Sequence, residues 1–157
     1  MHRRILALDV GDRTVGLSIS DALGYTAQPL KTLRYKTLAE RKTVFAELAK
    51  ILTEMDVGTL LIGLPLNMNG SEGPQATKVR DFVTALQNFL TKSRIDLTTL
   101  TWQFWDERLS TAGAERRLIE ADVSRSKRKT VIDTMAAVFI LQGFLESQID
   151  SHSQDDG

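Results

Sequence analysis

The first third of the chain has the hydrophobic pattern of consecutive strands. Residues 4–10 predict a strand covered on both faces, because the run 5–8 is apolar at both parities, and residues 14–20 alternate like a half-exposed strand. A tight turn at 11–13 joins the two, which predicts a β-hairpin. Residues 25–33 predict a third strand, and Pro29 indicates that it is irregular or lies at an edge of the sheet.

Helical and strand patterns alternate along the rest of the chain. A strand, a helix and a strand at this spacing pair in parallel, whereas the opening hairpin pairs antiparallel. The chain is therefore predicted to be an α/β protein with a mixed sheet. The expected elements are helices over 38–55, 76–90, about 111–122 and 129–149, and strands over 59–63 and 97–105.

Length and composition favour one domain. The 157 residues, 42% hydrophobic and 25% charged, suit a single domain over 1–149 with a disordered polar tail over 150–157. No cysteine is present, which excludes disulfides and thiolate metal sites. No signal peptide and no apolar stretch of membrane-spanning length is visible, so we expect a cytoplasmic protein without a membrane partner.

Two acids stand out against apolar surroundings. Asp9 is at the end of the first predicted strand, where a carboxylate is costly unless it has a use. Asp133 is the only charged residue of the stretch 131–145, which is apolar nearly all round and therefore predicts a buried helix. Asp133 could equally serve only to stabilise the helix N-terminus through its dipole, and the sequence does not decide between the two.

A third acid comes from the pair Asp106 and Glu107 at the end of the last strand. Strand alternation sends neighbouring side chains to opposite faces, so only one of them would join the other acids. Asp106 shares its parity with the apolar residues of that strand, but alternation can fail at a strand's last residue, so both stay open. The simplest alternative is a turn acid paired with Arg108.

Acids from three separate elements predict a metal site. Packed carboxylates repel one another unless a divalent cation lies between them, and oxygen ligands favour Mg²⁺ or Mn²⁺ over Zn²⁺. One or two such ions would support hydrolysis of a phosphodiester bond. The only histidines, His2 and His152, lie near the two ends, and neither a P-loop nor a serine-hydrolase motif is present.

A polyanionic substrate would need local positive charge, because the 20 basic and 20 acidic side chains balance. A basic segment precedes Asp133, and the loop 65–74 offers polar side chains and glycines for phosphate or sugar. Solvated surface loops are the alternative for both. The candidate nucleic-acid contacts are Arg13, Asn67, Asn69, Ser71, Arg108, Arg116, Arg117, Arg125, Lys127, Arg128 and Lys129.

Four motifs in order carry a family resemblance: Asp9-x-Gly11, GLPLNMNG at 63–70, DERLST at 106–111 and VID at 131–133. With them the chain resembles the YqgF family of bacterial proteins, which are similar to Holliday junction resolvases and are described as nucleases of pre-16S rRNA. The resemblance spans about residues 4–148. It implies a ribonuclease H-like fold with a five-stranded mixed sheet, the first three strands antiparallel, flanked by helices.

The resemblance also implies a metal-dependent nuclease site. It assigns Asp9, Glu107 and Asp133 as catalytic acids and ligands of Mg²⁺ or Mn²⁺, with Asp106 in reserve. Many related nucleases carry a fourth acid near the last one, whereas Thr134, Met135 and Ala136 follow here. A three-acid site is expected to hold a second metal weakly.

The expected function is therefore processing of structured RNA, foremost the 5′ end of pre-16S rRNA. The alternatives are a Holliday junction resolvase-like endonuclease acting on branched DNA, and a nucleic-acid or ribosome-assembly binding module with little catalysis. Resolvase relatives act as dimers, so the resemblance also raises a homodimer, for which the sequence shows no interface. An actin-like ATPase is disfavoured, because the chain is too short for two lobes.

Overall fold

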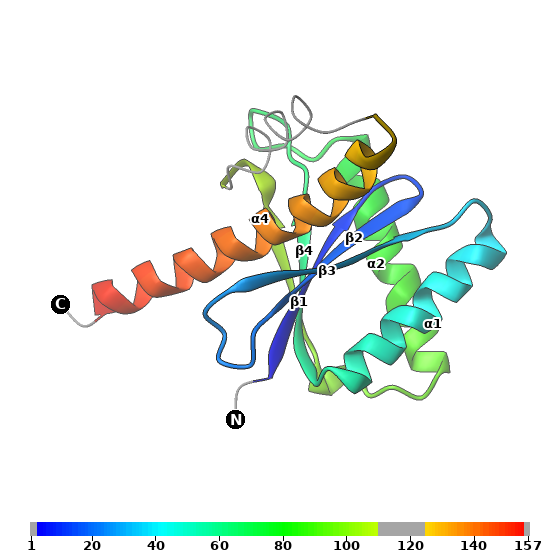
Figure 1. Ribbon diagram of the computed structural model, residues 1–157, viewed down its shortest axis with the longest axis horizontal. Coiled ribbons are helices and arrows are strands. Elements are labelled where there is room, and N and C mark those ends of the chain that lie inside the picture. The colour runs from blue at the N-terminus through cyan, green and yellow to red at the C-terminus, as the bar shows by residue number, and fades with distance from the viewer. Residues whose placement is uncertain (1–2, 110–124, 156–157) are drawn as a thin grey trace.

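The computed structural model describes residues 3–109 and 125–155, with side chains of the last helix described over 134–149. Five strands form one mixed sheet in the order β3-β2-β1-β4-β5 (Figure 1). The first three strands pair antiparallel, and β4 and β5 continue the sheet in parallel with β1, as the sequence predicts. The elements are β1 Arg4–Val10, β2 Thr14–Ser20, β3 Ala27–Arg34, α1 Leu38–Glu54, β4 Val57–Leu64, α2 Pro74–Lys92, β5 Thr101–Asp106 and α4 Arg125–Asp155, with short 3₁₀ helices η1 Leu97–Thr99 and η2 Glu107–Leu109.

The largest differences from the predicted boundaries are in the last strand and the last helix. The last strand begins at Thr101 rather than 97, because Asp96 accepts a hydrogen bond from the Thr98 amide and winds 97–99 into η1. The last helix begins at Arg125 rather than 129 and continues to Asp155, so the expected disordered tail is helical over most of its length. The helix expected over about 111–122 lies outside the described residues.

The edge position predicted from Pro29 is confirmed. β3 is the outer strand next to β2, and its pairing register shifts where Pro29 faces Ser18. A proline cannot donate to the ladder, which is tolerated at an edge strand or at such an irregularity.

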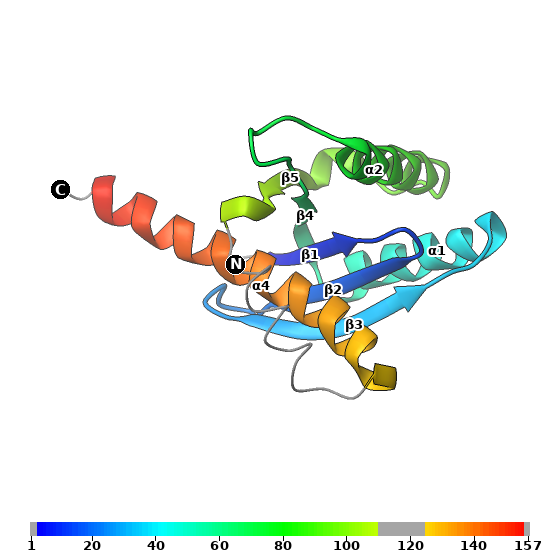
Figure 2. The same ribbon diagram turned by 90° about the horizontal axis from the view of Figure 1, so that it is seen from above.

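The helices cover the sheet on both faces (Figure 2). α1 and α2 lie on one face over a large core, to which β1 contributes Leu6 and Leu8. α4 lies on the other face over a smaller core that includes Ala7 and Leu61. Strand alternation therefore divides β1 and β4 between two cores, and each residue's parity tells which helices it faces.

Small and hydroxylated residues bring α4 close to the sheet. Ala136 and Ala137 are fully buried, and the buried Ser18 hydroxyl donates a 2.7 Å hydrogen bond to the Ala137 carbonyl. Further along, the Thr32 and Thr134 hydroxyl oxygens lie 2.6 Å apart. These two contacts hold residues 134–137 of α4 against β2 and β3.

Candidate active site

Asp9 lies near the carboxyl end of β1 on the face that α4 covers. It comes two residues after Ala7, which is buried in the core beneath α4, and its own side chain is half-buried. Asp9 pairs with Gly16 on β2, and Gly16 pairs with Thr32 on β3. Since Thr32 contacts Thr134, this row across the sheet runs from Asp9 to a residue next to Asp133 in the chain.

Glu107 reaches the same face from the other side. It is the first residue of η2, directly after β5, and it is half-buried. A Cβ atom built on Gly63, near the end of β4, would lie 2.6 Å from Glu107 Oε1 and 2.6 Å from Ile140 Cδ1 of α4. The Glu107 carboxylate therefore occupies the space that a side chain at position 63 would take.

Gly63 is also the neighbour of Asp9. The parallel register pairs Leu8 with Ile62, so the next residues of the two strands, Asp9 and Gly63, lie side by side. Neighbouring strands are about 4.8 Å apart. The missing side chain at position 63 thus leaves space for the Glu107 carboxylate on the face of the sheet to which Asp9 belongs.

Asp106 lies on the opposite face and is bound to Arg108. It pairs with Leu64 and shares its parity with Trp102 and Phe104, which pack against the core under α1 and α2. Arg108 Nη2 lies 2.8 Å from Asp106 Oδ2, and the Arg108 amide donates to Oδ1 at 2.9 Å. The hydrogen bonds from Arg108 hold the pKa of Asp106 below its usual range. The apolar side chains of β5, and Asp106 with them, therefore lie on the face opposite Asp9. Glu107 lies on the same face as Asp9.

Arg108 also holds the loop between β4 and α2. Its Nη1 donates a 3.2 Å hydrogen bond to the Met68 carbonyl, and its guanidinium lies against Gly70, whose φ of 86° suits glycine. Met68 itself is 96% exposed at the tip. The Asp106–Arg108 pair therefore connects the end of β5 to this loop.

The polar side chains of the loop bind one another. Asn67 Nδ2 donates to the Ser71 hydroxyl at 3.0 Å, and that hydroxyl donates to Asn69 Oδ1 at 2.6 Å. A bridge between Leu66 and Glu72 closes the loop. These bonds shape the loop, and all three side chains remain exposed. Their contact with nucleic acid stays a prediction.

Replacing Arg108 by Ala is expected to loosen this loop. The variant loses the bond to the Met68 carbonyl and leaves Asp106 unpaired, so amide hydrogen exchange at Asn67, Gly70 and Ser71 should speed up by about tenfold. Hydrogen exchange followed by NMR measures this, with Lys92→Ala on the exposed end of α2 as the control. Unchanged exchange in the loop would show that Arg108 does not hold it.

The remaining predicted residues are only partly described. Asp133 belongs to α4 next to Thr134, but its side chain lies outside the described part, and so do those of Arg125, Lys127, Arg128 and Lys129. These four residues were expected in or just after a loop, and all fall within α4. Arg116 and Arg117 lie outside the described residues. Arg13 is exposed in the β1–β2 turn.

The described donors fit a hard divalent cation. Asp9 and Glu107 supply carboxylate oxygens, the ligands that Mg²⁺ and Mn²⁺ prefer, and Gly63 leaves space between them. Within the ranges that the structure describes, no group of three metal-ligating side chains is assembled. The three-acid site therefore stays a prediction that depends on Asp133.

Comparison with known proteins places the chain in a family. The family model RuvX, described as Holliday junction resolvase, matches residues 3–147. The chain belongs to the RuvX family. A protein of Desulforamulus reducens named "Putative pre-16S rRNA nuclease" is 50% identical over 144 residues, covering 92% of this chain and 97% of the relative. A protein of the same name from Clostridioides difficile is 49% identical over 148 residues, covering 94% and 97%. The family resemblance seen in the sequence is confirmed.

Solved structures show the fold. Thermus thermophilus RuvC in complex with a Holliday junction substrate matches the RuvX chain with a TM-score of 0.59 at 10% identity, covering 95% of this chain and 97% of that one. A second T. thermophilus RuvC structure matches with a TM-score of 0.57 at 12% identity, covering 94% and 96%. The predicted ribonuclease H-like fold is thereby confirmed.

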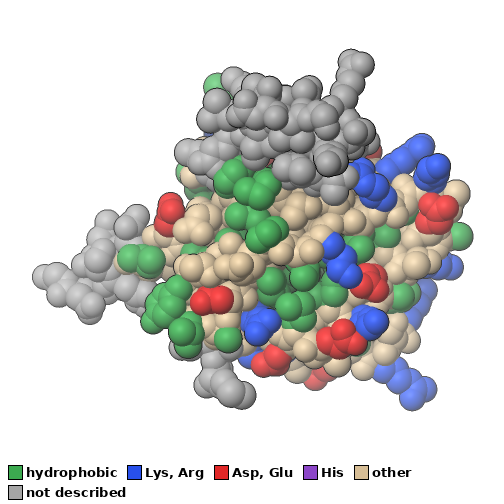
Figure 3. Space-filling view, in the orientation of Figure 1, with side chains coloured by type: hydrophobic (Ala, Val, Ile, Leu, Met, Phe, Trp, Pro, Cys, Tyr) green, Lys and Arg blue, Asp and Glu red, His purple; other side chains and the backbone are tan. Residues whose placement is uncertain are grey.

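Two further observations bear on where a partner could bind. Figure 3 shows Lys and Arg side chains interspersed with Asp and Glu on the visible face, consistent with the zero net charge of the chain. In the described part of the chain, none of the helices has the length and apolar character needed to cross a membrane.

Proposed function

We propose that this RuvX-family protein is a metal-dependent nuclease of structured nucleic acid, and that its substrate is the 5′ end of pre-16S rRNA. The observation that carries the proposal is the placement of Glu107 over Gly63, next to Asp9, at the carboxyl ends of the central strands. The names of relatives that are 50% and 49% identical over nearly the whole chain favour rRNA as the substrate. The proposal includes a cytoplasmic location.

In this proposal the chain supplies fixed carboxylates. Asp9 on β1, Glu107 on η2 and, as the third ligand, Asp133 on α4 would hold one or two Mg²⁺ or Mn²⁺ ions. When bound, such an ion supplies positive charge that polarises the scissile phosphate and lowers the pKa of an attacking water. The rigid central strand fixes Asp9, and Gly63 lets Glu107 approach it, so the donors need little rearrangement.

A branched DNA substrate is the second candidate. It is favoured by the description of the matching family model and by the solved RuvC complex with a Holliday junction. Both candidates present phosphodiesters to the same acids. The substrate therefore has to be decided by measurement.

Cleavage should depend on a divalent metal and on Asp9. We expect wild-type protein to cleave an RNA carrying the 5′ precursor sequence of 16S rRNA when Mg²⁺ or Mn²⁺ is titrated in, and to lose activity with a chelator. Asp9→Asn should reduce the rate by at least about a hundredfold, because the amide loses the ligand charge. Gel assays on this RNA and on a four-way DNA junction, run side by side, measure both effects and identify the substrate.

The outcomes distinguish the three candidate functions: rRNA nuclease, junction resolvase and binding module. Cleavage of the junction alone would replace the rRNA assignment by a resolvase. Equal cleavage by wild type and Asp9→Asn would overturn the site. Salt-dependent binding of both substrates without cleavage at any metal concentration would identify a binding module instead.

A further inference from the structure

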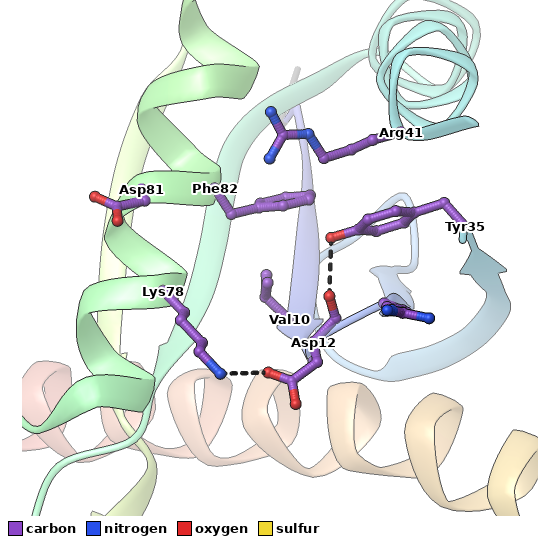
Figure 4. Close-up of a pocket in the computed structure, with 9 residues that line it drawn as sticks. Val10, Asp12, Tyr35, Arg41, Lys78, Asp81 and Phe82 are labelled. Carbon is purple, nitrogen blue, oxygen red and sulfur yellow. Dashed lines mark hydrogen bonds and ion pairs between the residues drawn. The ribbon is translucent and has the colours of Figure 1, made fainter. Parts of the chain in front are cut away.

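A cavity of about 450 Å³ opens beside the β1–β2 turn, on the face of the sheet away from α4 (Figure 4). Its walls come from four parts of the chain that are distant in sequence: the turn, the segment after β3, α1 and α2. The volume lies within the range of about 300–1,000 Å³ that small-molecule sites occupy. The lining residues used below are Asp12, Arg13, Tyr35, Arg41, Lys78, Asp81 and Phe82.

Three cations and two carboxylates line the cavity, so its lining carries an excess of one positive charge. Arg13 from the turn and Arg41 from α1 both line it, and within the described residues neither side chain forms an ion pair. Asp12 is already paired with Lys78, whose Nζ lies 3.1 Å from Asp12 Oδ1. Figure 4 shows the Asp81 carboxylate directed away from the cavity on α2. The two arginines therefore favour an anion.

An aromatic wall faces these cations. The Tyr35 hydroxyl donates a 3.2 Å hydrogen bond to the Asp12 carbonyl, and its amide donates to the Arg13 carbonyl at 3.0 Å, which fixes the ring beside the turn. Tyr35 and Phe82 extend toward one another across the cavity (Figure 4). Burial raises the pKa of Tyr35. The site thus combines a cationic side with a flat apolar side.

We propose that this cavity binds one nucleotide of a nucleic-acid strand, with the phosphate at Arg13 and Arg41 and the base against Tyr35. Arginine is the preferred partner of phosphate, and aromatic rings stack bases without regard to sequence. Phe82 is buried in the core, edge-to-face with Phe45, so the half-buried Tyr35 is the ring available to a base.

The cavity lies on the opposite face of the sheet from the Asp9 side chain, so a strand that contacts both would pass around the carboxyl end of β1. Asp12 is three positions after Asp9, a step that an extended chain spans in at most about 10 Å. At about 3.4 Å per nucleotide, that distance corresponds to roughly three nucleotides. Identification of the strand as substrate rests on the proposed function, whereas nucleotide binding by the cavity does not.

Calorimetric titration in metal-free buffer with a chelator tests binding without cleavage. The ligands are inorganic phosphate, adenosine monophosphate and a single-stranded RNA hexanucleotide. We expect Arg41→Gln and Arg13→Gln each to weaken hexanucleotide binding about tenfold, through loss of a charge-assisted hydrogen bond. Tyr35→Leu should weaken it by a similar factor, while Tyr35→Phe keeps the ring and binds within about threefold of wild type. Lys42→Gln, next to Arg41 on α1 but outside the cavity, is the matched control.

Each result decides the proposal. Losses confined to Arg13, Arg41 and Tyr35→Leu support it, and binding of the monophosphate in addition to the hexanucleotide would show that a free nucleotide also enters. No binding, equal loss in Lys42→Gln, or phosphate binding as tightly as the nucleotide ligands would overturn it. Arg13 is exposed, so its variant keeps the test valid if Arg41→Gln does not fold. Because the titration is metal-free and follows no cleavage, its outcome is independent of the cleavage assay on Asp9→Asn, so the two proposals fail separately.

Discussion

Glu107→Gln is expected to reduce metal-dependent cleavage by at least about a hundredfold, whereas Asp106→Asn should stay within about fivefold of wild type. The two acids are neighbours in sequence and differ in place. Glu107 lies over Gly63 next to Asp9, whereas Asp106 lies on the opposite face, bound to Arg108. Only the first substitution removes a carboxylate from the proposed metal site.

The pair serves as its own control, because both substitutions are isosteric and remove one negative charge. Rates measured on the same substrate over a Mn²⁺ titration separate loss of metal affinity from loss of turnover. Thermal unfolding should show both variants folded. A larger loss of cleavage in Asp106→Asn than in Glu107→Gln would mean that the reserve residue is the ligand and that Glu107 is structural.

The strand pattern alone does not decide between Asp106 and Glu107. The alternation of β5 could be read from the sequence, and it correctly groups Asp106 with Trp102 and Phe104. Which face of the sheet carries the site depends on α4, whose contacts with β1 and β2 join residues over a hundred positions apart, as from Ser18 to Ala137. Local periodicity contains no information about that packing.

The fold itself was largely predictable, because strands and helices have different hydrophobic periods. The opening hairpin, the parallel strands and the edge position of Pro29 all follow from local pattern. The boundaries of the elements were harder to predict. The start of β5 depends on a turn formed by Asp96, and α4 extends into a polar segment that has no apolar periodicity.

The cavity beside the β1–β2 turn was missed for a similar reason. Arg41 falls within the helix predicted over 38–55 and Tyr35 lies two residues after the strand predicted over 25–33, and neither stands out in the sequence. Their meeting with Arg13 and Phe82 depends on how α1 and α2 pack against the sheet. Of these residues, only Arg13 was predicted to contact nucleic acid, because it lies in the turn after Asp9.

Gly63→Ala is expected to lower the cleavage rate by at least about tenfold while the protein stays folded. The new Cβ would meet Glu107 Oε1 and Ile140 Cδ1, each at 2.6 Å, so both side chains must shift. Both contacts are at the far ends of flexible side chains, and overpacking of this kind costs about 1–3 kcal/mol. The carboxylate then moves from its place beside Asp9, and a displacement of about 1 Å in a catalytic group can cost about a hundredfold in rate.

A second substitution separates the two clashes. Ile140→Val removes the Cδ1 atom, so the double variant Gly63→Ala/Ile140→Val should recover most of the lost thermal stability. It should not recover cleavage, because Glu107 still meets the new methyl group. Gly58→Ala, at the other end of β4, is the control for a clash far from Asp9: its new Cβ would lie 2.7 Å from Arg3 Cβ, a stiffer contact than those at position 63, and the variant should keep its activity. Full activity of Gly63→Ala would show that Glu107 acts from another position, and recovery of cleavage by Ile140→Val would assign the loss to the packing of α4.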